Sequence, residues 1–267
     1  MGVLFVCDVD GTLVRGSLLS ERAEDSLNCF VERGNYLSLA TGRNAFAIKW
    51  IEERVKINAP CILLTGAQLY NSGTCKRLNI KPMDNDVLLQ LQNVYDSYPD
   101  MGIQVFTGTG LKNLRQNRFL KEGGIKEERE LGESALYELQ GEDVLKIGLC
   151  CEDVSKIEEA IGRFFYNTAL YNWHYSFHIG AEVFNPSVSK GCSVRDVISL
   201  LPEKPSLVAV AGDSPNDLSM FECADIRFAP ETSFDEVKKK ADFIISDPEE
   251  GGIADALAII EEIKNKR

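Results

Sequence analysis

The feature that most constrains the fold of this chain is its first apolar segment, which runs straight into a pair of acidic residues. In "VLFVCDVDGTL", residues 3–13, the apolar run is followed by Asp8 and Asp10, and then by Gly11 and Thr12. Carboxylates are costly to remove from water, and two that lie close together repel each other. A buried strand that ends in this way therefore needs a cation or a basic partner at its end.

The neighbouring segments alternate between helical patterns and apolar runs. We predict helices at about residues 20–33 and 45–55 and strands at 36–41 and 61–65. Such alternation is typical of βαβ units around a parallel sheet. The pattern returns after Pro186, where the predicted helices are 189–201, 214–224, 235–241 and 251–267 and the predicted strands are 206–213, 225–230 and 242–246. The sequence therefore predicts an α/β fold with a Rossmann-like core.

A segment of different character interrupts this pattern. Its predicted elements are helices at 85–98 and 153–165 and strands at 102–108, 143–152, 170–179 and 181–185. This order is typical of an α+β domain with a mostly antiparallel sheet. We therefore expect a core domain formed by residues 1–81 and 187–267, with residues 82–186 inserted as a second domain.

One predicted strand of the insertion alternates between two kinds of side chain. We expect one face to lie in the core of the inserted domain, and it carries Tyr171, Trp173, Tyr175, Phe177 and Ile179. The other face includes His174 and His178, which are expected to be ordinary surface residues rather than metal ligands.

Composition limits the classes of partner. The 267 residues carry a net charge of −12, which disfavours nucleic acid and anionic membranes, so an anionic substrate requires a local positive site or a metal. No segment is long enough to cross a bilayer, and "MGVLFVCD" reaches a charge too early for a signal peptide. The eight cysteines include no C-x-x-C pair and are expected to be reduced thiols of a cytoplasmic protein. The oligomeric state stays open.

Polar residues follow several predicted strands of the core. They are Asp8, Asp10, Gly11 and Thr12; Thr41, Gly42 and Arg43; and Gly212, Asp213, Asn216 and Asp217, joined by Lys190 from the start of a helix. In an open parallel sheet, ligands bind beyond the carboxyl ends of the strands. Carboxylates that converge there need a cation, and hard oxygen ligands with room for phosphate suit Mg²⁺.

The spacing of the first two aspartates suits phosphoryl transfer. Residues two apart in an extended segment point the same way, so one carboxylate can attack phosphorus while the other protonates the leaving oxygen and later deprotonates water. Gly11 permits a sharp turn, and Thr41, the Gly42 amide and the Lys190 ammonium can stabilise the phosphoryl oxygens.

Four segments in order, "DVDGT", "ATGR", "SKG" and "GDSPND", resemble motifs one to four of the haloacid dehalogenase (HAD) superfamily. The insertion between the second and third resembles the type IIB cap of its Cof-type phosphatases, and the resemblance covers nearly the whole chain. It implies a HAD-like core with an α+β cap. Two segments depart from the Cof-type pattern: "TGA" at Thr65–Ala67 replaces Asn-Gly-Ala, and "FAPETS" at residues 228–233 replaces Val-Ala-Met-Gly-Asn-Ala.

The resemblance also implies roles for individual residues. Asp8 is expected to be the nucleophile and Asp10 the acid/base, while Thr41 and Lys190 bind phosphate. The implied Mg²⁺ ligands are Asp8, the Asp10 carbonyl oxygen and Asp213, supported by Asn216 and Asp217. Further candidates for substrate binding are Gly11, Thr12, Gly42, Arg43 and Asn216. Three residues have structural alternatives: Arg43 as an exposed residue of a first helical turn, Thr41 as a helix cap, and Asp217 as a residue that holds its loop.

We therefore expect a Mg²⁺-dependent phosphatase of small phosphorylated metabolites, above all sugar phosphates, acting through an aspartyl-phosphate. A phosphomutase with the same aspartate chemistry is one alternative. A phospho-acceptor signalling module is another, and the second aspartate and the long insertion speak against it. No G-x-x-x-x-G-K-[ST] segment occurs, which disfavours a P-loop kinase.

Overall fold

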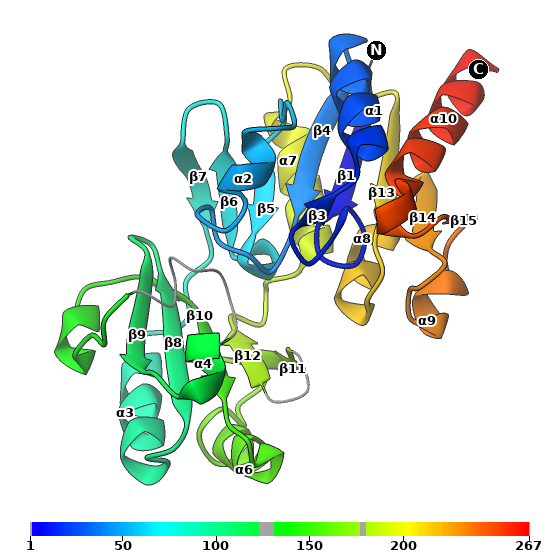
Figure 1. The fold of residues 1–267 in the computed structure, drawn as a ribbon. Coiled ribbons are helices and arrows are strands. Elements are labelled where there is room, and N and C mark those ends of the chain that lie inside the picture. Colours follow the sequence, from blue (N-terminus) through cyan, green and yellow to red (C-terminus); the bar gives the residue numbers. More distant parts are fainter. Residues whose placement is uncertain (1, 123–130, 177–179, 267) are drawn as a thin grey trace. The chain divides into compact units, whose positions relative to one another are not determined.

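The computed structural model describes residues 2–122, 131–176 and 180–266, and the chain divides into two compact units (Figure 1). The core unit consists of Met1–Asn79 and Ser189–Arg267, and the cap unit of Ile80–Val188. The predicted insertion, residues 82–186, lies inside the cap unit. Each unit is described below by itself.

The core unit is built on a sheet with the strand order β15-β14-β13-β1-β4-β5-β6-β7. The strands are β1 (Val3–Asp8), β4 (Tyr36–Ala40), β5 (Cys61–Leu63), β6 (Gln68–Asn71), β7 (Lys76–Ile80), β13 (Leu207–Ala211), β14 (Ile226–Pro230) and β15 (Phe243–Ile245). From β15 to β5 all neighbours are parallel, and β6 is antiparallel to β5. This confirms the predicted parallel-sheet core.

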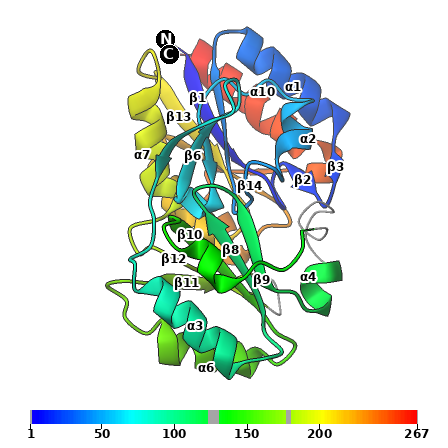
Figure 2. The same ribbon diagram turned by 90° about the vertical axis from the view of Figure 1, so that its left-hand side faces the viewer.

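Helices cover both faces of this sheet (Figures 1 and 2). On one face α1 (Glu21–Glu32) packs against α10 (Gly252–Asn265), and on the other α7 (Lys190–Leu200) packs against α8 (Leu218–Phe221). Successive side chains of β1 alternate between the faces. Phe5 meets Phe30 of α1 with ring centroids 6.2 Å apart, whereas Leu4 and Val6 pack with Val194 of α7. Asp8 therefore ends β1 on the α7 side of the sheet.

Shorter elements connect these strands. They are β2 (Val14–Arg15), β3 (Leu18–Leu19), α2 (Lys49–Glu52), α9 (Asp235–Lys238) and 3₁₀ turns at Leu64–Gly66, Pro215–Asp217 and Pro248–Glu250. The predicted helix at 45–55 is wrong in length, because only Lys49–Glu52 is α-helical. The Asn44 side chain accepts from the Ala47 amide. Further on, several amides donate to the carbonyl oxygen three residues earlier, as in a 3₁₀ turn; one example is the bond from the Ile51 amide to the Ile48 carbonyl oxygen. The predicted helix at 214–224 likewise begins as a 3₁₀ turn.

The cap unit contains a second, antiparallel sheet with the order β11-β12-β10-β8-β9. Its strands are β8 (Gly102–Thr107), β9 (Leu111–Arg115), β10 (Val144–Cys150), β11 (Asn172–Tyr175) and β12 (Gly180–Phe184). Helices α3 (Val87–Ser97) and α6 (Val154–Phe164) share a hydrophobic core with these strands, and α4 (Arg118–Glu122) and a 3₁₀ turn at Leu136–Leu139 complete the unit. This confirms the predicted α+β insertion.

The aromatic stripe predicted to lie in the cap core is only partly buried. Tyr171 is 3% exposed and packs edge-on against Phe165, with ring centroids 5.2 Å apart. The interpretation is wrong for Trp173 and Tyr175, which are 36% and 48% exposed. Their strand, β11, is the edge of the sheet, where both side chains line an open cavity beside α6 and the Tyr175 hydroxyl donates to Glu158 of that helix at 2.6 Å. Phe177, His178 and Ile179 of the predicted stripe and its opposite face lie outside the described residues.

Charged residues gather on neighbouring strands of the cap sheet. Lys146 of β10 is buried and donates to Glu182 of β12 at 2.7 Å, and its ammonium lies 4.6 Å from the centre of the Phe106 ring. His174 lies 3.4 Å from the same carboxylate. Burial acts to raise the pKa of Glu182, but the Lys146 charge and the His174 contact together lower it to about 2.

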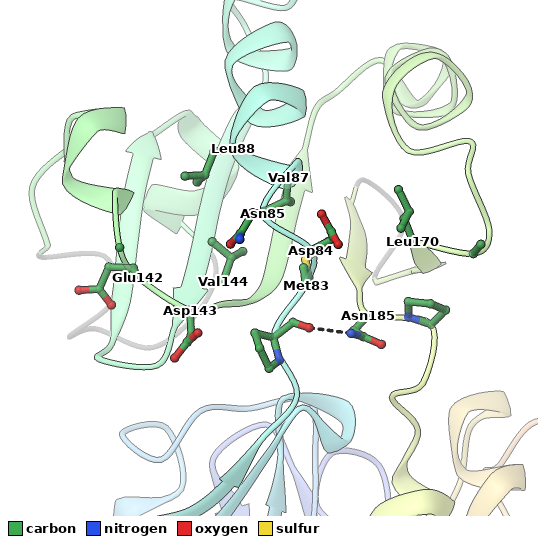
Figure 3. Close-up of a pocket in the computed structure, with 14 residues that line it drawn as sticks. Met83, Asp84, Asn85, Val87, Leu88, Glu142, Asp143, Val144, Leu170 and Asn185 are labelled. Carbon is green, nitrogen blue, oxygen red and sulfur yellow. Dashed lines mark hydrogen bonds between the residues drawn. The ribbon is translucent and has the colours of Figure 1, made fainter.

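A cavity of about 530 Å³ opens at one end of the cap unit (Figure 3). It lies beside both segments that connect the cap unit to the core, at Pro82 and at Asn185–Pro186. The Asn185 side-chain amide donates to the Pro82 carbonyl oxygen at 2.6 Å, and the Met83 amide donates to Val144 at 2.7 Å. The two connections are therefore joined by a hydrogen bond.

In the part of the chain that the structure describes, no helix combines the length and apolarity needed to span a bilayer.

Candidate active site

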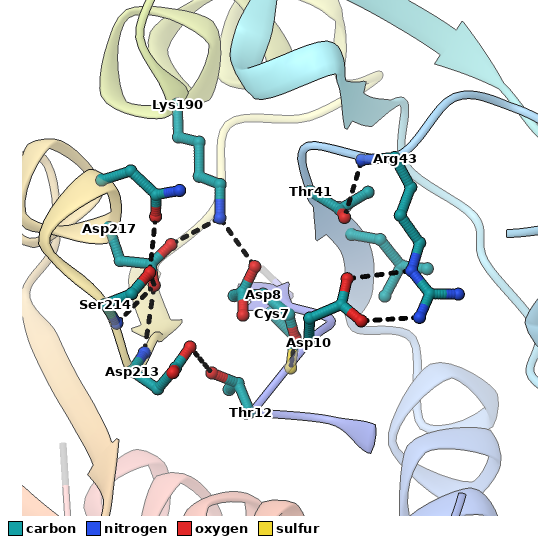
Figure 4. A network of polar contacts seen from close by, with 12 residues as sticks. Cys7, Asp8, Asp10, Thr12, Thr41, Arg43, Lys190, Asp213, Ser214 and Asp217 are labelled. Carbon is teal, nitrogen blue, oxygen red and sulfur yellow. Dashed lines mark hydrogen bonds and ion pairs between the residues drawn. The ribbon is translucent and has the colours of Figure 1, made fainter. Parts of the chain in front are cut away.

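The centre of the site is a buried lysine between two carboxylates (Figure 4). The Lys190 ammonium donates to Asp8 Oδ1 and to Asp217 Oδ1, each at 2.6 Å, and its side chain is 1% exposed. Lys190 is the first residue of α7, whose N-cap Ser189 accepts from the Cys192 amide at 3.1 Å. The helix start thus delivers a cation to the end of β1.

Gly191 allows α7 to approach α8 this closely. A Cβ atom at this position would lie 2.0 Å from the Ser219 carbonyl oxygen, well inside any van der Waals contact. The Gly191 amide donates to Ser219 Oγ at 3.1 Å. The place of the neighbouring ammonium therefore depends on a residue without a side chain.

The carboxylates and the lysine perturb one another. Burial, followed by the charge of Asp217, raises the pKa of Asp8 well above its usual range, and the Lys190 charge opposes this. Burial acts to lower the pKa of Lys190, but the charges of Asp217 and Asp8 raise it on balance. The lysine is therefore held protonated as the counter-ion of the two acids.

Asp213 brings a third carboxylate to this centre. Carboxylate oxygens of Asp8, Asp213 and Asp217 all lie within 4.8 Å of one another. Burial and the Asp217 charge raise the pKa of Asp213 to about 6. Asp8 Oδ2 is buried and has no hydrogen-bond partner among the described residues. An unpartnered buried oxygen within an all-oxygen acidic set fits a hard divalent cation such as Mg²⁺.

Asp217 also organises its own loop. Its Oδ2 accepts from the amides of Asp213 and Ser214 at 3.0 and 3.1 Å, while Oδ1 accepts from Lys190. The Ser214 hydroxyl donates to Asn216 Oδ1 at 2.8 Å. These contacts match the structural alternative for Asp217, a residue that holds the loop carrying Asp213. They also place Asn216 within that loop.

Gly11 and Thr12, both predicted to contact substrate, contact Asp213 in the structure. Gly11 has a φ of +84°, and a Cβ there would lie 2.6 Å from Asp213 Oδ2. The Thr12 hydroxyl donates to Asp213 Oδ1 at 3.2 Å. The turn after β1 thus positions the third carboxylate.

Asp10 forms a separate pair with Arg43. The Arg43 Nε and Nη2 atoms donate to Asp10 Oδ2 and Oδ1 at 2.8 and 2.6 Å (Figure 4). Thr41 is buried, and its hydroxyl accepts from the Arg43 amide at 3.1 Å, across Gly42. The hydroxyl therefore holds this turn, but it does not cap a helix as its structural alternative requires, because α2 begins only at Lys49. The Arg43 side chain is 19% exposed and paired with Asp10, so it is not the exposed residue of a first helical turn that its own alternative describes.

Beside this turn lies a strained segment that could not be predicted from the sequence. Leu64 and Thr65 have φ values of +51° and +61°, and a β-branched residue rarely adopts this conformation. Their amides donate to the carbonyl oxygens of Arg43 and Thr41 at 3.1 and 3.0 Å. Thr65 Oγ1 is buried without a hydrogen-bond partner among the described residues. The "TGA" segment departs from the Cof-type pattern at this place, but the residue types alone do not predict the backbone conformation.

The sequence model of the haloacid dehalogenase-like hydrolase family matches residues 5–257. The 5-amino-6-(5-phospho-D-ribitylamino)uracil phosphatase YwtE of Bacillus subtilis is 26% identical over 272 residues, covering 92% of this chain and 94% of that protein.

Two solved structures show the same fold over nearly the whole chain. A haloacid dehalogenase-like hydrolase from Bacteroides thetaiotaomicron superposes with a TM-score of 0.83 at 21% identity, covering 97% of this chain and 100% of that one. The subclass IIB sugar phosphatase BT4131 superposes with a TM-score of 0.78 at 16% identity, covering 98% of this chain and 99% of that one. Both likenesses concern the fold.

Proposed function

The chain belongs to the haloacid dehalogenase-like hydrolase family, and from this premise we propose that it is a Mg²⁺-dependent phosphatase of small phosphorylated metabolites. Sugar phosphates and related phosphorylated polyols are the proposed substrates, in keeping with the phosphoribitylamino compound in the name of the Bacillus subtilis relative. We place the reaction in the cytoplasm, where the free thiols of this chain stay reduced.

The single observation that carries the proposal is the environment of Asp8. One carboxylate oxygen is held by Lys190 at 2.6 Å, and the other is buried without a hydrogen-bond partner among the described residues. An oxygen that is positioned but not hydrogen-bonded suits a nucleophile. In the first step Asp8 Oδ2 attacks phosphorus, the bond from phosphorus to the ester oxygen breaks, and Asp10 gives a proton to that oxygen.

In the second step the enzyme is restored. Asp10 takes a proton from water, the water oxygen attacks phosphorus, and the bond between phosphorus and Asp8 breaks to release inorganic phosphate. Lys190 turns an N–H toward a phosphoryl oxygen and opposes the charge that accumulates there. Thr41 and the Gly42 amide line the same end of the sheet.

Asp8, the Asp10 carbonyl oxygen and Asp213 are the proposed Mg²⁺ ligands, with Asp217 and Asn216 holding the loop. When bound, the ion supplies positive charge that offsets both the carboxylates and the phosphoryl oxygens. The fit rests on the all-oxygen cluster of Asp8, Asp213 and Asp217, whose carboxylate oxygens lie within 4.8 Å of one another.

Release of inorganic phosphate from p-nitrophenyl phosphate and from a panel of phosphorylated metabolites tests this proposal. We expect hydrolysis that requires Mg²⁺ and that Asp8→Asn abolishes while the far-ultraviolet circular dichroism is unchanged. Activity that survives Asp8→Asn would refute the covalent route. Isomerised sugar phosphate in place of free phosphate would show a mutase instead.

A further inference from the structure

We propose that the cap unit carries a binding site for a quaternary ammonium group, in the cavity between α6 and the edge strand β11. This site goes beyond the proposed phosphatase reaction and does not depend on it. All of the residues that line the cavity belong to the cap unit. Its aromatic walls, its charge and the helix beside it each favour such a ligand.

The walls of the cavity are aromatic. Trp173 and Tyr175 of β11 line it together with Tyr166, which follows the end of α6, and all three side chains are exposed. The ring planes of Trp173 and Tyr175 are 86° apart, with centroids separated by 5.2 Å. A flat ligand stacks on one plane only, whereas a rounded cation can contact two perpendicular rings at once. The faces of such rings are negative and attract cations, and those of tryptophan do so most strongly.

The charge of the cavity is negative. Among its lining residues is one carboxylate, that of Glu158 in α6, and no basic side chain. Glu158 Oε1 accepts from the Tyr175 hydroxyl at 2.6 Å, and its charge is not offset by an ion pair with any residue that the structure describes. A cation therefore gains from the carboxylate as well as from the rings. A quaternary ammonium has methyl groups in place of N–H bonds, so it leaves no hydrogen-bond donor unpaired between apolar walls.

The helix side of the cavity is left open by a glycine. Gly162 lies inside α6, and a Cβ atom at this position would have no neighbour within 4 Å outside its own helical turn. The buried side chains of Ile161 and Phe165 line the same cavity and supply apolar surface. The volume of about 370 Å³ lies within the range of about 300–1,000 Å³ that is usual for small-molecule sites.

Choline and 3,3-dimethyl-1-butanol test the proposal, because they share a shape and differ in charge. In the alcohol a neutral carbon replaces the quaternary nitrogen. Saturation-transfer NMR of the methyl protons measures the binding of each compound to the full chain, with sodium chloride adjusted to keep the ionic strength constant. We expect saturable binding of choline in the millimolar range, and about 10-fold weaker binding of the alcohol.

Three variants locate the site. Trp173→Leu keeps an apolar wall but removes the ring that attracts cations most strongly, and should weaken choline binding about 10-fold. Gly162→Leu fills the cavity from a helical position that favours leucine over glycine, so it should abolish choline binding without loss of fold. Glu158→Gln should weaken choline binding about 2- to 5-fold and leave the binding of the alcohol unchanged.

Tyr137→Leu is the matched control, since Tyr137 is an exposed aromatic residue of the cap unit that does not line the cavity. It should bind choline as the wild type does. Absence of choline binding, equal affinity for choline and the alcohol, or choline binding unchanged in both Trp173→Leu and Gly162→Leu would overturn the inference.

Self-association of the wild type in analytical ultracentrifugation, abolished by Trp173→Leu, would also overturn it. The cavity would then be an interface between two copies of the chain. None of these outcomes bears on the phosphatase reaction, which is measured separately.

Discussion

The Lys190 ammonium reaches Asp8 Oδ1 across 2.6 Å although 182 positions of sequence separate the two residues. The contact joins the first strand of the core unit to a helix that begins after the whole cap unit. Both side chains are buried, so water could not take the place of either partner if it were removed. The stability of the core unit and the charge balance of the site therefore depend on the same contact.

Lys190→Met should leave two buried carboxylates, Asp8 and Asp217, without their cation. Breaking a buried pair in this way typically costs about 3–5 kcal/mol of unfolding free energy. Urea denaturation in the absence of divalent metal measures this loss. Lys238→Met, which removes a surface pair with Asp235, should cost less than about 1 kcal/mol. Equal losses in the two variants would contradict this account of the site.

Mg²⁺ should stabilise the folded protein by binding to the acidic cluster. A ligand that binds only the folded state at about 100 times its dissociation constant adds about 2.7 kcal/mol. Thermal unfolding with excess Mg²⁺ or with EDTA measures the shift, and Asp213→Asn should abolish it. Asp242→Asn, at a surface pair with Arg227, should retain it. A shift that persists in Asp213→Asn would place the ion elsewhere.

Gly191→Ala should destabilise the core unit, because its Cβ would overlap the Ser219 carbonyl oxygen. Overpacking of this kind costs about 1–3 kcal/mol, and the displaced Lys190 should lower kcat as well. Gly162→Ala is the opposite case, since Gly162 lies within α6 with nothing near its Cβ position. It should stabilise that helix by about 0.5–1 kcal/mol. Denaturation curves and initial rates distinguish the two variants.

The ion pair of Glu182 should make stability depend on acid pH. Its pKa is about 2 in the folded state against an ordinary value of 4.5, so the contribution is complete above about 4.5 and is lost as the pH falls toward 2. The difference in unfolding free energy between the wild type and Glu182→Gln, up to about 3 kcal/mol, should therefore shrink between pH 5 and pH 3. Glu32→Gln, at an exposed pair with Lys56 that also lowers the pKa of the Glu32 carboxyl, should show a much smaller trend, because water screens that pair. A difference for Glu182→Gln that is constant with pH would contradict the assignment.

Thr65 should lower the stability of the folded protein in two separable ways. Thr65→Ala removes the buried, unpartnered hydroxyl but keeps the unfavourable φ, whereas Thr65→Gly relieves both. A buried hydroxyl without a partner costs about 1–3 kcal/mol, and left-handed backbone at an ordinary residue about 1 kcal/mol. Stability should rise from wild type to Thr65→Ala and again to Thr65→Gly. A fall in both variants would show that the hydroxyl is satisfied.

Much of the fold follows from pattern. The alternation of apolar runs and helices predicts the parallel sheet, because β1, β4 and β13 are buried on both faces and read as continuous apolar segments. Their carboxyl ends share one edge, so the approach of Asp8 and Asp213 could be predicted without coordinates. The antiparallel sheet of the insertion was equally predictable from the order of its helices and strands.

The features that could not be predicted from the sequence depend on the position of a residue in the fold rather than on its type. The exposure of Trp173 and Tyr175 follows from the edge position of β11, which alternation along one strand does not reveal. The pairing of Arg43 with Asp10 depends on side-chain rotamers in two loops that are far apart in the sequence. The left-handed backbone at Thr65 is imposed by contacts with Thr41 and Arg43, against the preference of the residue itself.

The hydrogen bond from Asn185 to Pro82 has a consequence for the architecture of the whole chain. A segment of more than a hundred residues departs and comes back at a single point, so its removal would leave two ends close enough to be rejoined by a short turn. The strand order of the core sheet would survive that excision. Because it is attached at one point, the inserted unit could be exchanged for another of different shape without changing the sequence of the core unit.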